Sequence, residues 1–502
     1  MNATRMIAGI LVLCVPAGLV GGCSTSGRRS SADAAKISSR PDYLGMVRAY
    51  ADTLLQKGRD SYGRVHSPLI ASTLDRSSLS LPETRPPNIQ GIRNGDRSTT
   101  GANVFHDQDL YQVLYALSEV TVDRHYAKAA DAALTYFFKH WQSPATGRMA
   151  WGEHLSWGFK EDYVAGRGGD EGPHEFYGPW VLWDRSFKLA PQACTKFARG
   201  LWDHQIHEHS GDFSRHAKWV RHGTGINNGY PRHGGFYIAT WAEAYERTKD
   251  PVFLKAIETL VDHYERTSHP DTGAIPCSTN PHRIHIMWPE SNLSLATDLW
   301  DAAGKVPEKL ARKMRERAFK TDRVFISLEH EFDPVGRGFV AGANVATLKR
   351  LTEGPWTDTK IWATGYGKAT DAQVAMQCYL RYQQVGLPGY ARLVLDAASR
   401  YLYTEPNLAI TLYPGSMADA IFLMLAAYRL TGRQYYLDRA DYFARQAVEI
   451  FFDDTSPLPK ASSKHNHYET ITGGDDLMAA LLNVWAAQNL PERKLLTVYN
   501  HR

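Results

Sequence analysis

One short stretch of this sequence combines a phenol, a guanidinium and an imidazole at the expected start of a helix. Tyr230, Arg232 and His233 are followed directly by Gly234 and Gly235. Two adjacent glycines allow a backbone or a ligand to approach closely, and the unpaired amide N–H groups of a helix start favour an anion. An arginine beside a tyrosine stabilises the phenolate, so that the tyrosine becomes a usable base. We expect His233 to hold or neutralise a carboxylate. The alternative is that Arg232 and His233 only cap the helix and pair with acidic neighbours.

Similar polar and aromatic residues fill the other segments that precede expected helices. These segments are 151–157, 170–180 and 227–237, followed later by 282–288 and 465–469. If they meet at one place, convergent polar groups in an aromatic hollow are the default hypothesis for a site. The residues for which we expect catalytic roles are His174, Tyr230, Arg232, His233 and Tyr237. The expected substrate-binding residues are Glu153, His154, Trp157, Glu175, Trp180, Asn228, Arg283 and His285.

Phenol, imidazole and guanidinium groups together suit a β-elimination on a polysaccharide that contains uronic acids. The reaction removes the weakly acidic C5 proton of a sugar that carries a carboxylate, and it releases the oxygen on C4. It needs a cationic or amide group to neutralise the carboxylate, a base for the proton and an acid for the leaving oxygen. Arginine gives bidentate recognition of a carboxylate, and tyrosine and histidine fill the acid and base roles. The expected partner is therefore an acidic polysaccharide.

A variant of this chemistry assisted by a divalent metal uses the same segments. His154, His174 and one of Glu153 or Glu175 could ligate such an ion. The spacing of these residues is not diagnostic of a metal site, so the chemistry that we expect uses no cofactor.

The segments that carry these residues connect helices that come in pairs. A first helix is expected at 43–57, and a last one at 475–488 completes its pair. Between them, apolar residues recur at helical spacing in the pairs 107–120 with 125–141, 174–188 with 191–206, 234–247 with 251–266, 291–303 with 308–319, 370–385 with 389–403, and 415–430 with 435–452. The turns into three of the second helices form a near-repeat, at 123–126, 250–253 and 432–437. Such repetition is typical of a protein built from one repeated hairpin.

These seven hairpins favour an all-α fold in which the pairs close into an (α/α) toroid. The small residues Ala239, Ala242, Ala296 and Ala418 fall on the inner helices, where bulkier ones would crowd the axis. An open α-solenoid would need capping repeats and near-uniform connectors, whereas the connectors here are long and polar. Segment 328–368 shows strand-like alternation with glycines, and we expect it to form a lid over one mouth. The toroid is expected to occupy residues 41–490 as one domain.

The first residues resemble a lipoprotein export signal. Arg5 precedes an apolar run from Met6 to Val20, which has the length of a signal peptide and is short for a membrane-spanning helix. The run leads to Cys23 in a sequence similar to a bacterial lipobox. We therefore expect a signal peptide at 1–23, lipidation at Cys23 and a flexible tether at 24–40. The protein would then be anchored to the outer membrane, in the periplasm or at the cell surface; an ordinary cleaved secretory signal is the alternative.

The composition sets further limits. A formal net charge of +4 over 502 residues gives no support to a nucleic-acid partner. The 13 Trp and 26 Tyr residues supply aromatic planes on which sugar rings stack, although many of them must fill helix interfaces. Beyond Cys23, the residues Cys194, Cys277 and Cys378 are scattered and odd in number, and their spacing indicates neither a disulfide framework nor a CxxC metal motif.

With these residues and this helix order, the chain resembles the toroid polysaccharide lyases, which act on alginate, glucuronan and related polyuronates. The resemblance covers roughly 43–488 and is carried by the helix order and the His, Tyr and Arg connectors. It implies that His174 neutralises the substrate carboxylate and that Tyr230 is the base or a shared acid and base. It also implies that Arg232 supports Tyr230, that His233 lies next to the carboxylate and that Tyr237 supplies a second phenol.

Other functions stay open on the same fold, because the Asn–His pair typical of the lyase group is replaced here by Glu153-His154 and His174-Glu175. A glycoside hydrolase, such as an unsaturated glucuronyl hydrolase, needs two opposed carboxylates. The available acids are Asp170, Glu171, Glu175 and Asp476. A sugar epimerase uses histidine pairs on a similar toroid, although an export signal argues against it. A surface glycan-binding lipoprotein needs only the aromatic platform and not an Arg–His–Tyr cluster.

Overall fold

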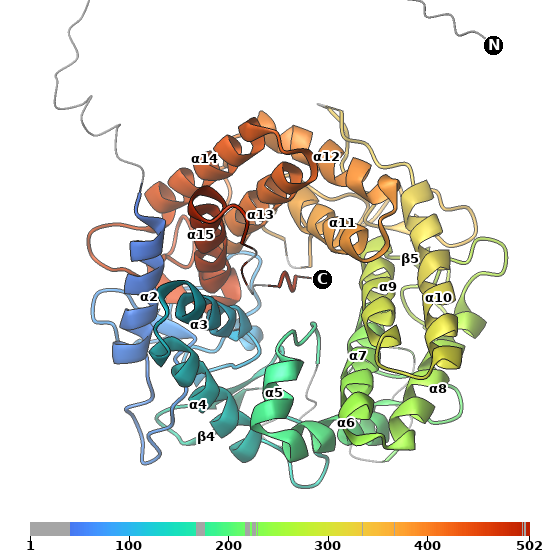
Figure 1. Ribbon diagram of the computed structural model, residues 1–502, viewed down its shortest axis with the longest axis horizontal. Helices are drawn as coiled ribbons and strands as arrows, with labels where there is room; N and C mark the ends of the chain where they lie inside the picture. The colour runs from blue at the N-terminus through green and yellow to red at the C-terminus, as the bar shows by residue number, and fades with distance from the viewer. Residues whose placement is uncertain are drawn as a thin grey trace, which may run out of the picture. The chain divides into compact units, whose positions relative to one another are not determined.

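Helical hairpins follow one another around a ring in the computed structural model of the protein (Figure 1). The structure describes residues 41–166, 176–215, 221–222, 227, 229–333, 335–365, 367–493, 495 and 498–501. The ring lies within the unit 42–502. The predicted (α/α) toroid is confirmed.

Each hairpin pairs a helix of an inner ring with a helix of an outer ring. The inner helices are α3 (Gln108–Thr121), α5 (Trp183–Leu189), α7 (Pro231–Thr248), α9 (Pro289–Ala303), α11 (Asp371–Val385), α13 (Pro414–Thr431) and α15 (Gly474–Asn489). The outer helices are α4 (His125–His140), α6 (Pro191–Gln205), α8 (Pro251–Thr267), α10 (Glu308–Ser327), α12 (Pro388–Leu402), α14 (Gln434–Phe451) and α2 (Tyr43–Lys57). The pair of α15 with α2 closes the ring, as predicted.

The two rings differ in how completely their helices are buried. α13 is buried on all sides from Pro414 to Ile421, because it packs between α11, α14 and α15. α14 buries one stripe that includes Leu437, Ala440 and Phe443. A helix that is apolar all round belongs in an interior, whereas a helix with a single apolar stripe covers that interior from outside. The burial of these two helices therefore matches their places in the inner and the outer ring.

The connectors differ sharply between the two ends of the ring. Inner helices lead to outer helices through the short segments 122–124, 190, 249–250, 304–307, 386–387 and 432–433. Outer helices lead back to inner helices through the long segments 58–107, 141–182, 206–230, 268–288, 328–370, 403–413 and 452–473. Every long connector therefore reaches the ring at the N-terminal end of an inner helix. We call this end of the ring, made by the long connectors and those helix starts, the rim.

Short antiparallel strands join the long connectors to one another. β1 (Thr73–Asp75) pairs with β7 (His467–Glu469) and ties the first connector to the last. β2 (Gly101–Ala102), β3 (Leu155–Gly158) and β4 (Tyr163–Gly166) form a three-stranded sheet. β5 (Ile286–Met287) pairs with β6 (Ala343–Asn344). In the expected lid segment 328–368, the described strand is only this two-residue β6, and turns and isolated bridges make up most of the rest.

Two helices differ most in extent from the sequence prediction. The helix expected at 174–188 begins only at Trp183. Gly178 and Pro179 precede it, and a proline disfavours helical geometry in the residue before it. α10 continues to Ser327, beyond its expected end at 319, because Val324 and Phe325 extend its buried stripe.

The predictions for the N-terminus fall outside the described residues: the signal peptide at 1–23, lipidation at Cys23 and the tether at 24–40. In the part of the chain that the structure describes, no helix has both the length and the apolar surface that a bilayer crossing needs. Cys194, Cys277 and Cys378 are buried free thiols.

Candidate active site

Three inner helices have an aromatic residue at their start, on the rim. Tyr230 precedes α7, Trp288 precedes α9 and Tyr413 precedes α13, each in an extended conformation and each followed by a proline. Proline suits the first helical position, because its fixed φ matches the helix and its missing N–H would have no helical partner there. The residue before a proline is in turn held extended. This local sequence places three aromatic rings around the rim.

The phenol oxygen of Tyr230 lies between two guanidinium groups. Arg215 donates to it from Nη1 at 2.8 Å, and Arg283 donates from its own Nη1 at 3.4 Å. The guanidinium carbon of Arg215 also lies 5.2 Å from the centre of the phenol ring. Cationic donors aimed at one oxygen stabilise negative charge that develops on it during a proton transfer. Arg283 is among the predicted substrate-binding residues, whereas Arg215 is not.

Two indoles continue the aromatic surface away from Tyr230. The ring of Trp288 lies 4.8 Å from the ring of Tyr230, and Trp356 lies 5.7 Å from Trp288. Trp356 comes from the expected lid segment and is 39 % exposed. We call Tyr230, Trp288 and Trp356 the aromatic row. Rings in such a row offer apolar faces on which pyranose rings can stack.

Arg232 stands on the first turn of α7, next to the start of α9. Its backbone N–H donates to the hydroxyl oxygen of Ser291 at 3.0 Å, and its charge acts on the carboxylate of Glu290. Burial raises the pKa of Glu290, while Arg232 and a hydrogen bond from Gln377 at 2.9 Å act in the opposite direction. The buried Nε of Arg232 has no hydrogen-bond partner among the described residues. Arg232 therefore brings a positive charge to the rim, beside the start of α9.

The glycine pair that opens α7 serves helix packing. A Cβ on Gly234 would lie 1.9 Å from the hydroxyl oxygen of Tyr264, and a Cβ on Gly235 would lie 2.6 Å from a carboxylate oxygen of Asp298. Side chains of α8 and α9 thus fill the space beside both glycines. The groups that approach these glycines closely therefore belong to the protein itself.

Three of the predicted site residues are buried beneath the rim. His233 and Tyr237 are fully buried, and Trp180 is 3 % exposed. Tyr237 stacks on Phe176 with ring centres 6.3 Å apart. The structure therefore favours packing roles for Trp180 and Tyr237, since neither ring can meet a polymer. The centre of the His233 ring lies 5.5 Å from that of the Tyr230 ring, so the buried imidazole packs against the phenol.

A second polar cluster joins Asp96, Glu153 and His154 to Arg93. His154 lies 2.8 Å from Asp96 through Nδ1 and 3.4 Å from Glu153 through Nε2. Arg93 contacts Asp96 from Nε at 2.8 Å and forms an ion pair with Glu153. One ligand atom from each of Asp96, Glu153 and His154 lies within 4.8 Å of the others, a spacing that fits a divalent ion. In this structure the guanidinium of Arg93 supplies the positive charge at these carboxylates.

A buried histidine that the sequence analysis does not single out lies beside this cluster. His106 stands two residues before α3, within electrostatic reach of Asp96, His154 and Glu469. Burial lowers the pKa of His106 to about 4, although the carboxylates of Asp96 and Glu469 act to raise it. The ring is therefore neutral at pH 7. Its position at the end of a long connector, just before an inner helix, is the signal that could have found it.

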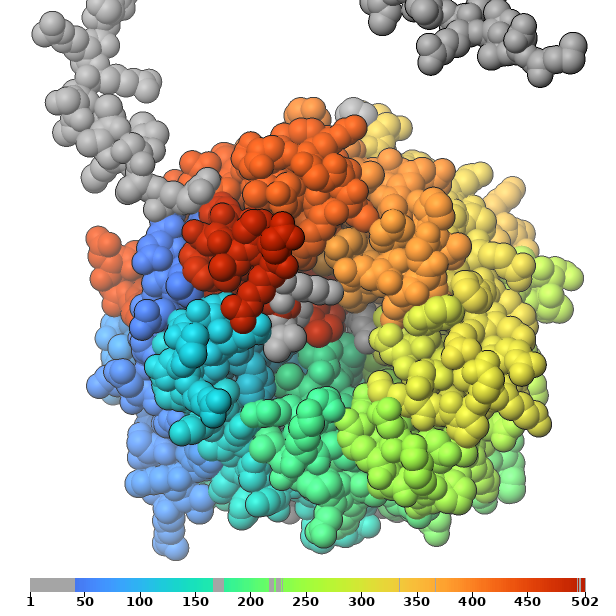
Figure 2. Space-filling model, viewed as in Figure 1, coloured from blue at the N-terminus to red at the C-terminus, as the bar shows by residue number. Residues whose placement is uncertain are grey.

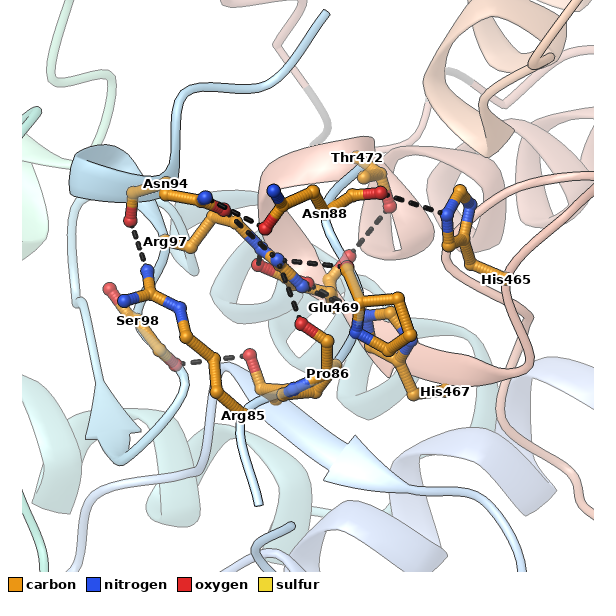
Figure 3. A network of polar contacts seen from close by, with 12 residues as sticks. Arg85, Pro86, Asn88, Asn94, Arg97, Ser98, His465, His467, Glu469 and Thr472 are labelled. Atoms are coloured by element: carbon orange, nitrogen blue, oxygen red, sulfur yellow. Dashed lines mark hydrogen bonds and ion pairs between the residues drawn. The ribbon is translucent and has the colours of Figure 1, made fainter. Parts of the chain in front are cut away.

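A buried ion pair holds the connectors that close the ring (Figure 3). Arg97 donates to both carboxylate oxygens of Glu469, from Nε at 2.8 Å and from Nη2 at 2.6 Å, and both side chains are almost fully buried. Arg97 also donates to the backbone oxygens of Pro86 and Pro87, and His467 lies 2.8 Å from Glu469. Burial would raise the pKa of Glu469, but the hydrogen bonds from Arg97 and His467 outweigh it and lower that pKa. The polar segment 465–469 thus has a structural role.

The remaining predicted residues divide into two groups. Trp157 stacks on Trp141 with ring centres 5.0 Å apart, and His285 is exposed on connector 268–288. The residues that lie outside the described part of the chain are His174, Glu175 and Asn228. The role of carboxylate neutraliser for His174 and a metal-ligand role for His174 or Glu175 stay predictions.

Comparison with known proteins gives one family and several similar folds. Residues 87–233 match the family model described as periplasmic pectate lyase, a stretch that runs from the connector before α3 to Arg232 and His233. A cellobiose 2-epimerase from Bacillus thermoamylovorans is similar at 10 % identity and TM-score 0.46, over 88 % of this chain and 99 % of its own. The GH76 α-mannanase BT2949 of Bacteroides thetaiotaomicron is similar at 8 % identity and TM-score 0.45, over 90 % of this chain and 98 % of its own. An unsaturated glucuronyl hydrolase from Streptococcus agalactiae is similar at 10 % identity and TM-score 0.46, over 92 % of this chain and 96 % of its own.

Proposed function

We propose that the protein is a polysaccharide lyase that cleaves a uronic-acid polymer by β-elimination at the rim. The observation that carries this proposal is the phenol oxygen of Tyr230, held between Arg215 and Arg283. Arg232 stands two residues away and brings a further positive charge to this part of the rim. Guanidinium groups around one phenol suit a reaction in which negative charge develops on the substrate. Because residues 87–233 match a family described as periplasmic pectate lyase, polygalacturonate is the first polymer to test.

In the proposed reaction, Arg232 and Arg283 bind the carboxylate of the sugar whose C4–O4 bond breaks. Their positive charge stabilises the carbanion that forms when the C5 proton leaves. Tyr230 acts as the shared base and acid: as phenolate it takes the proton from C5, and as phenol it returns that proton to O4. The electron pair left on C5 forms the C4–C5 double bond as the C4–O4 bond breaks. Arg215 stabilises the negative charge on the phenol oxygen before the first transfer and after the second.

The carboxylates near the axis do not favour a glycoside hydrolase. Asp109 and Asp476 are joined by a hydrogen bond, and ligand oxygens of the two lie within 4.8 Å of each other. Retaining hydrolases hold their two carboxyl groups about 5–5.5 Å apart, and inverting enzymes about 6.5–9.5 Å apart, so that a sugar fits between them. Two directly bonded carboxyl groups leave no such space. The other predicted acids, Asp170, Glu171 and Glu175, lie outside the described residues.

Ultraviolet absorbance separates the candidate functions, because only elimination creates a double bond conjugated with the carboxylate. We expect the absorbance to rise when the protein is mixed with polygalacturonate, with alginate, glucuronan and glycosaminoglycans as the comparison panel. Running the assay with Mn²⁺, with Ca²⁺ and with EDTA shows whether an ion at Asp96, Glu153 and His154 is needed. New reducing ends without absorbance would contradict the lyase proposal in favour of a hydrolase. Binding without either product would indicate a glycan-binding protein.

Replacing the exposed Trp356 with Ala tests the aromatic row. We expect KM for the polymer to rise about 2- to 10-fold, since one aromatic contact contributes about 0.5–1.5 kcal/mol. The value of kcat should stay near that of the wild type, because the indole touches no reacting atom. Tyr435→Ala is the matched control: Tyr435 is 43 % exposed, but it lies on α14 at the end of the ring opposite the rim. An equal rise in KM for both variants would contradict a sugar-binding role for the row.

We also propose that the protein is exported to the periplasm and anchored by lipid on Cys23. The apolar run before Cys23 and the periplasmic description of the matching family support this proposal. Cys23→Ala should move the protein from the membrane fraction to the soluble fraction of cells that express it. A variant that stays in the membrane fraction would contradict lipidation at this residue.

A further inference from the structure

The last described residues of the chain lie inside the ring of helices. The last described residues lie near the centre of the ring, beside the mark C in Figure 1, and Figure 2 shows that the surface is hollowed there. Residues 498–501 are all hydrogen-bonded to side chains of inner helices. We call residues 498–501 the plug.

The plug is held by its backbone and by its side chains. The N–H of Val498 donates to Oε1 of Gln112 at 2.6 Å, and Nε2 of Gln112 donates back to the carbonyl oxygen of Val498 at 3.1 Å. Tyr499 donates its hydroxyl to Asp419 at 2.6 Å. Because α3 supplies Gln112 and α13 supplies Asp419, the plug bridges inner helices that are far apart in the sequence.

The plug also covers the acidic groups that line the hollow. Asn500 donates from Nδ2 to Asp109 at 2.6 Å. His501 lies 3.0 Å from Asp476 through Nε2 and 3.3 Å from Asp419 through Nδ1. Burial opposes the charged form of this imidazole, but the two carboxylates raise the pKa of His501 well above its usual value. The imidazolium therefore balances negative charge that would otherwise face the hollow.

A chain of contacts joins the plug to the proposed site. Nε2 of Gln377 donates to the carbonyl oxygen of His501 at 3.4 Å and to Glu290 at 2.9 Å. Glu290 in turn lies within electrostatic reach of Arg232. Gln377, Glu290 and Arg232 all stand in the N-terminal halves of their helices, which is the end of the ring where Tyr230 lies. The plug thus ends close to the rim residues that the proposed reaction uses.

We propose that the plug is the end wall of the uronate cleft and that it determines whether an acidic polymer can bind there. This inference rests on the proposed function. Asp109, Asp419 and Asp476 would repel a polyanion if they faced the cleft uncovered, because like charges in a hollow of low dielectric repel strongly. The plug covers these carboxylates with hydrogen bonds and with the charge of His501. It is therefore a specificity-determining segment.

The test uses full-length protein that carries Tyr230→Phe, so that bound oligosaccharide is not turned over. The triple variant Tyr499→Phe, Asn500→Ala and His501→Ala removes the side-chain anchors of the plug. Arg493→Ala is the control, because Arg493 forms an exposed ion pair with Glu119 just before the plug. Hydrogen exchange of residues 498–501 reports whether the plug is seated, and calorimetry gives the affinity for an oligogalacturonate at low and at high salt.

We expect exchange of the plug to accelerate at least about tenfold in the triple variant only, since local opening then costs less free energy. At low salt the affinity for the oligogalacturonate should be about tenfold lower in the triple variant than in its parent. This difference should shrink as salt screens the exposed carboxylates. Faster exchange in the triple variant with unchanged affinity would overturn the proposal. Exchange of residues 498–501 at the rate of a free peptide in the protein without the triple substitution would also overturn it. Neither hydrogen exchange nor calorimetry depends on elimination. If the proposed lyase function is wrong, the ultraviolet assay shows this separately, because no absorbing product forms.

Discussion

Tyr230→Phe is expected to lower kcat for the elimination about 10²- to 10⁴-fold, which is the usual contribution of a positioned acid or base. The substitution removes one hydroxyl and keeps the ring, whose centre lies 4.8 Å from that of Trp288. KM and the affinity for an oligogalacturonate should therefore change little, because Arg215, Arg283 and the aromatic row stay in place. Initial rates of absorbance increase give kcat and KM, and calorimetry gives the affinity.

The chain offers a closely matched control for this variant. Tyr413 precedes the proline that opens α13, just as Tyr230 precedes the proline that opens α7. Its hydroxyl donates to the backbone oxygen of Gln90. Tyr413→Phe should therefore leave kcat near the wild-type value. Full activity of Tyr230→Phe, or an equal loss in both variants, would remove Tyr230 from the proposed mechanism.

Arg97→Met is expected to lower the free energy of unfolding by about 3–5 kcal/mol, because it leaves the charge of Glu469 buried without its main partner. The two side chains are 0 % and 1 % exposed, and they join the connector before α3 to the connector before α15. Urea denaturation measures the change. Arg493→Met breaks an exposed ion pair with Glu119 and should cost about 0–1 kcal/mol. A loss as small as that of the control would show that the buried pair does not hold the ring closed.

The stabilising effect of this pair depends on pH in a defined direction. The pKa of Glu469 is lower in the folded protein than in the unfolded chain. Its contribution to stability is therefore complete above the unfolded value of about 4.3 and is lost as the pH falls through the folded value. The difference in stability between the wild type and Arg97→Met should be largest near neutral pH and should shrink under acidic conditions. A difference that grows as the pH falls would contradict this assignment.

Helix order and ring closure could be predicted because they depend on local patterns. Apolar spacing fixed the first helix at 43–57, where the structure also has it. The near-repeats marked the starts of outer helices, such as α8, which is capped by Asp250. The long, polar connectors then favoured a closed ring over an open solenoid, which needs near-uniform connectors. Local periodicity and connector length were therefore enough to identify the fold class.

The details of the site were less accessible, because they depend on contacts between distant segments. Arg215 lies 15 positions before Tyr230 in the sequence, and no pattern marks such a contact. The packing of Gly234 against Tyr264 depends on how α7 and α8 cross. The predicted toroid ended at residue 490, since the residues after it show no periodicity. Their place in the hollow follows from ring closure, which brings Asp109, Asp419 and Asp476 together.

The most direct test of the proposed site is a crystal structure of Tyr230→Phe with a bound oligogalacturonate. We expect a pyranose ring stacked on Trp288, its carboxylate within hydrogen-bond distance of Arg232 and Arg283, and its C5 facing the ring of residue 230. An oligosaccharide bound at the opposite end of the ring, among the short connectors, would contradict the assignment of the rim as the active site.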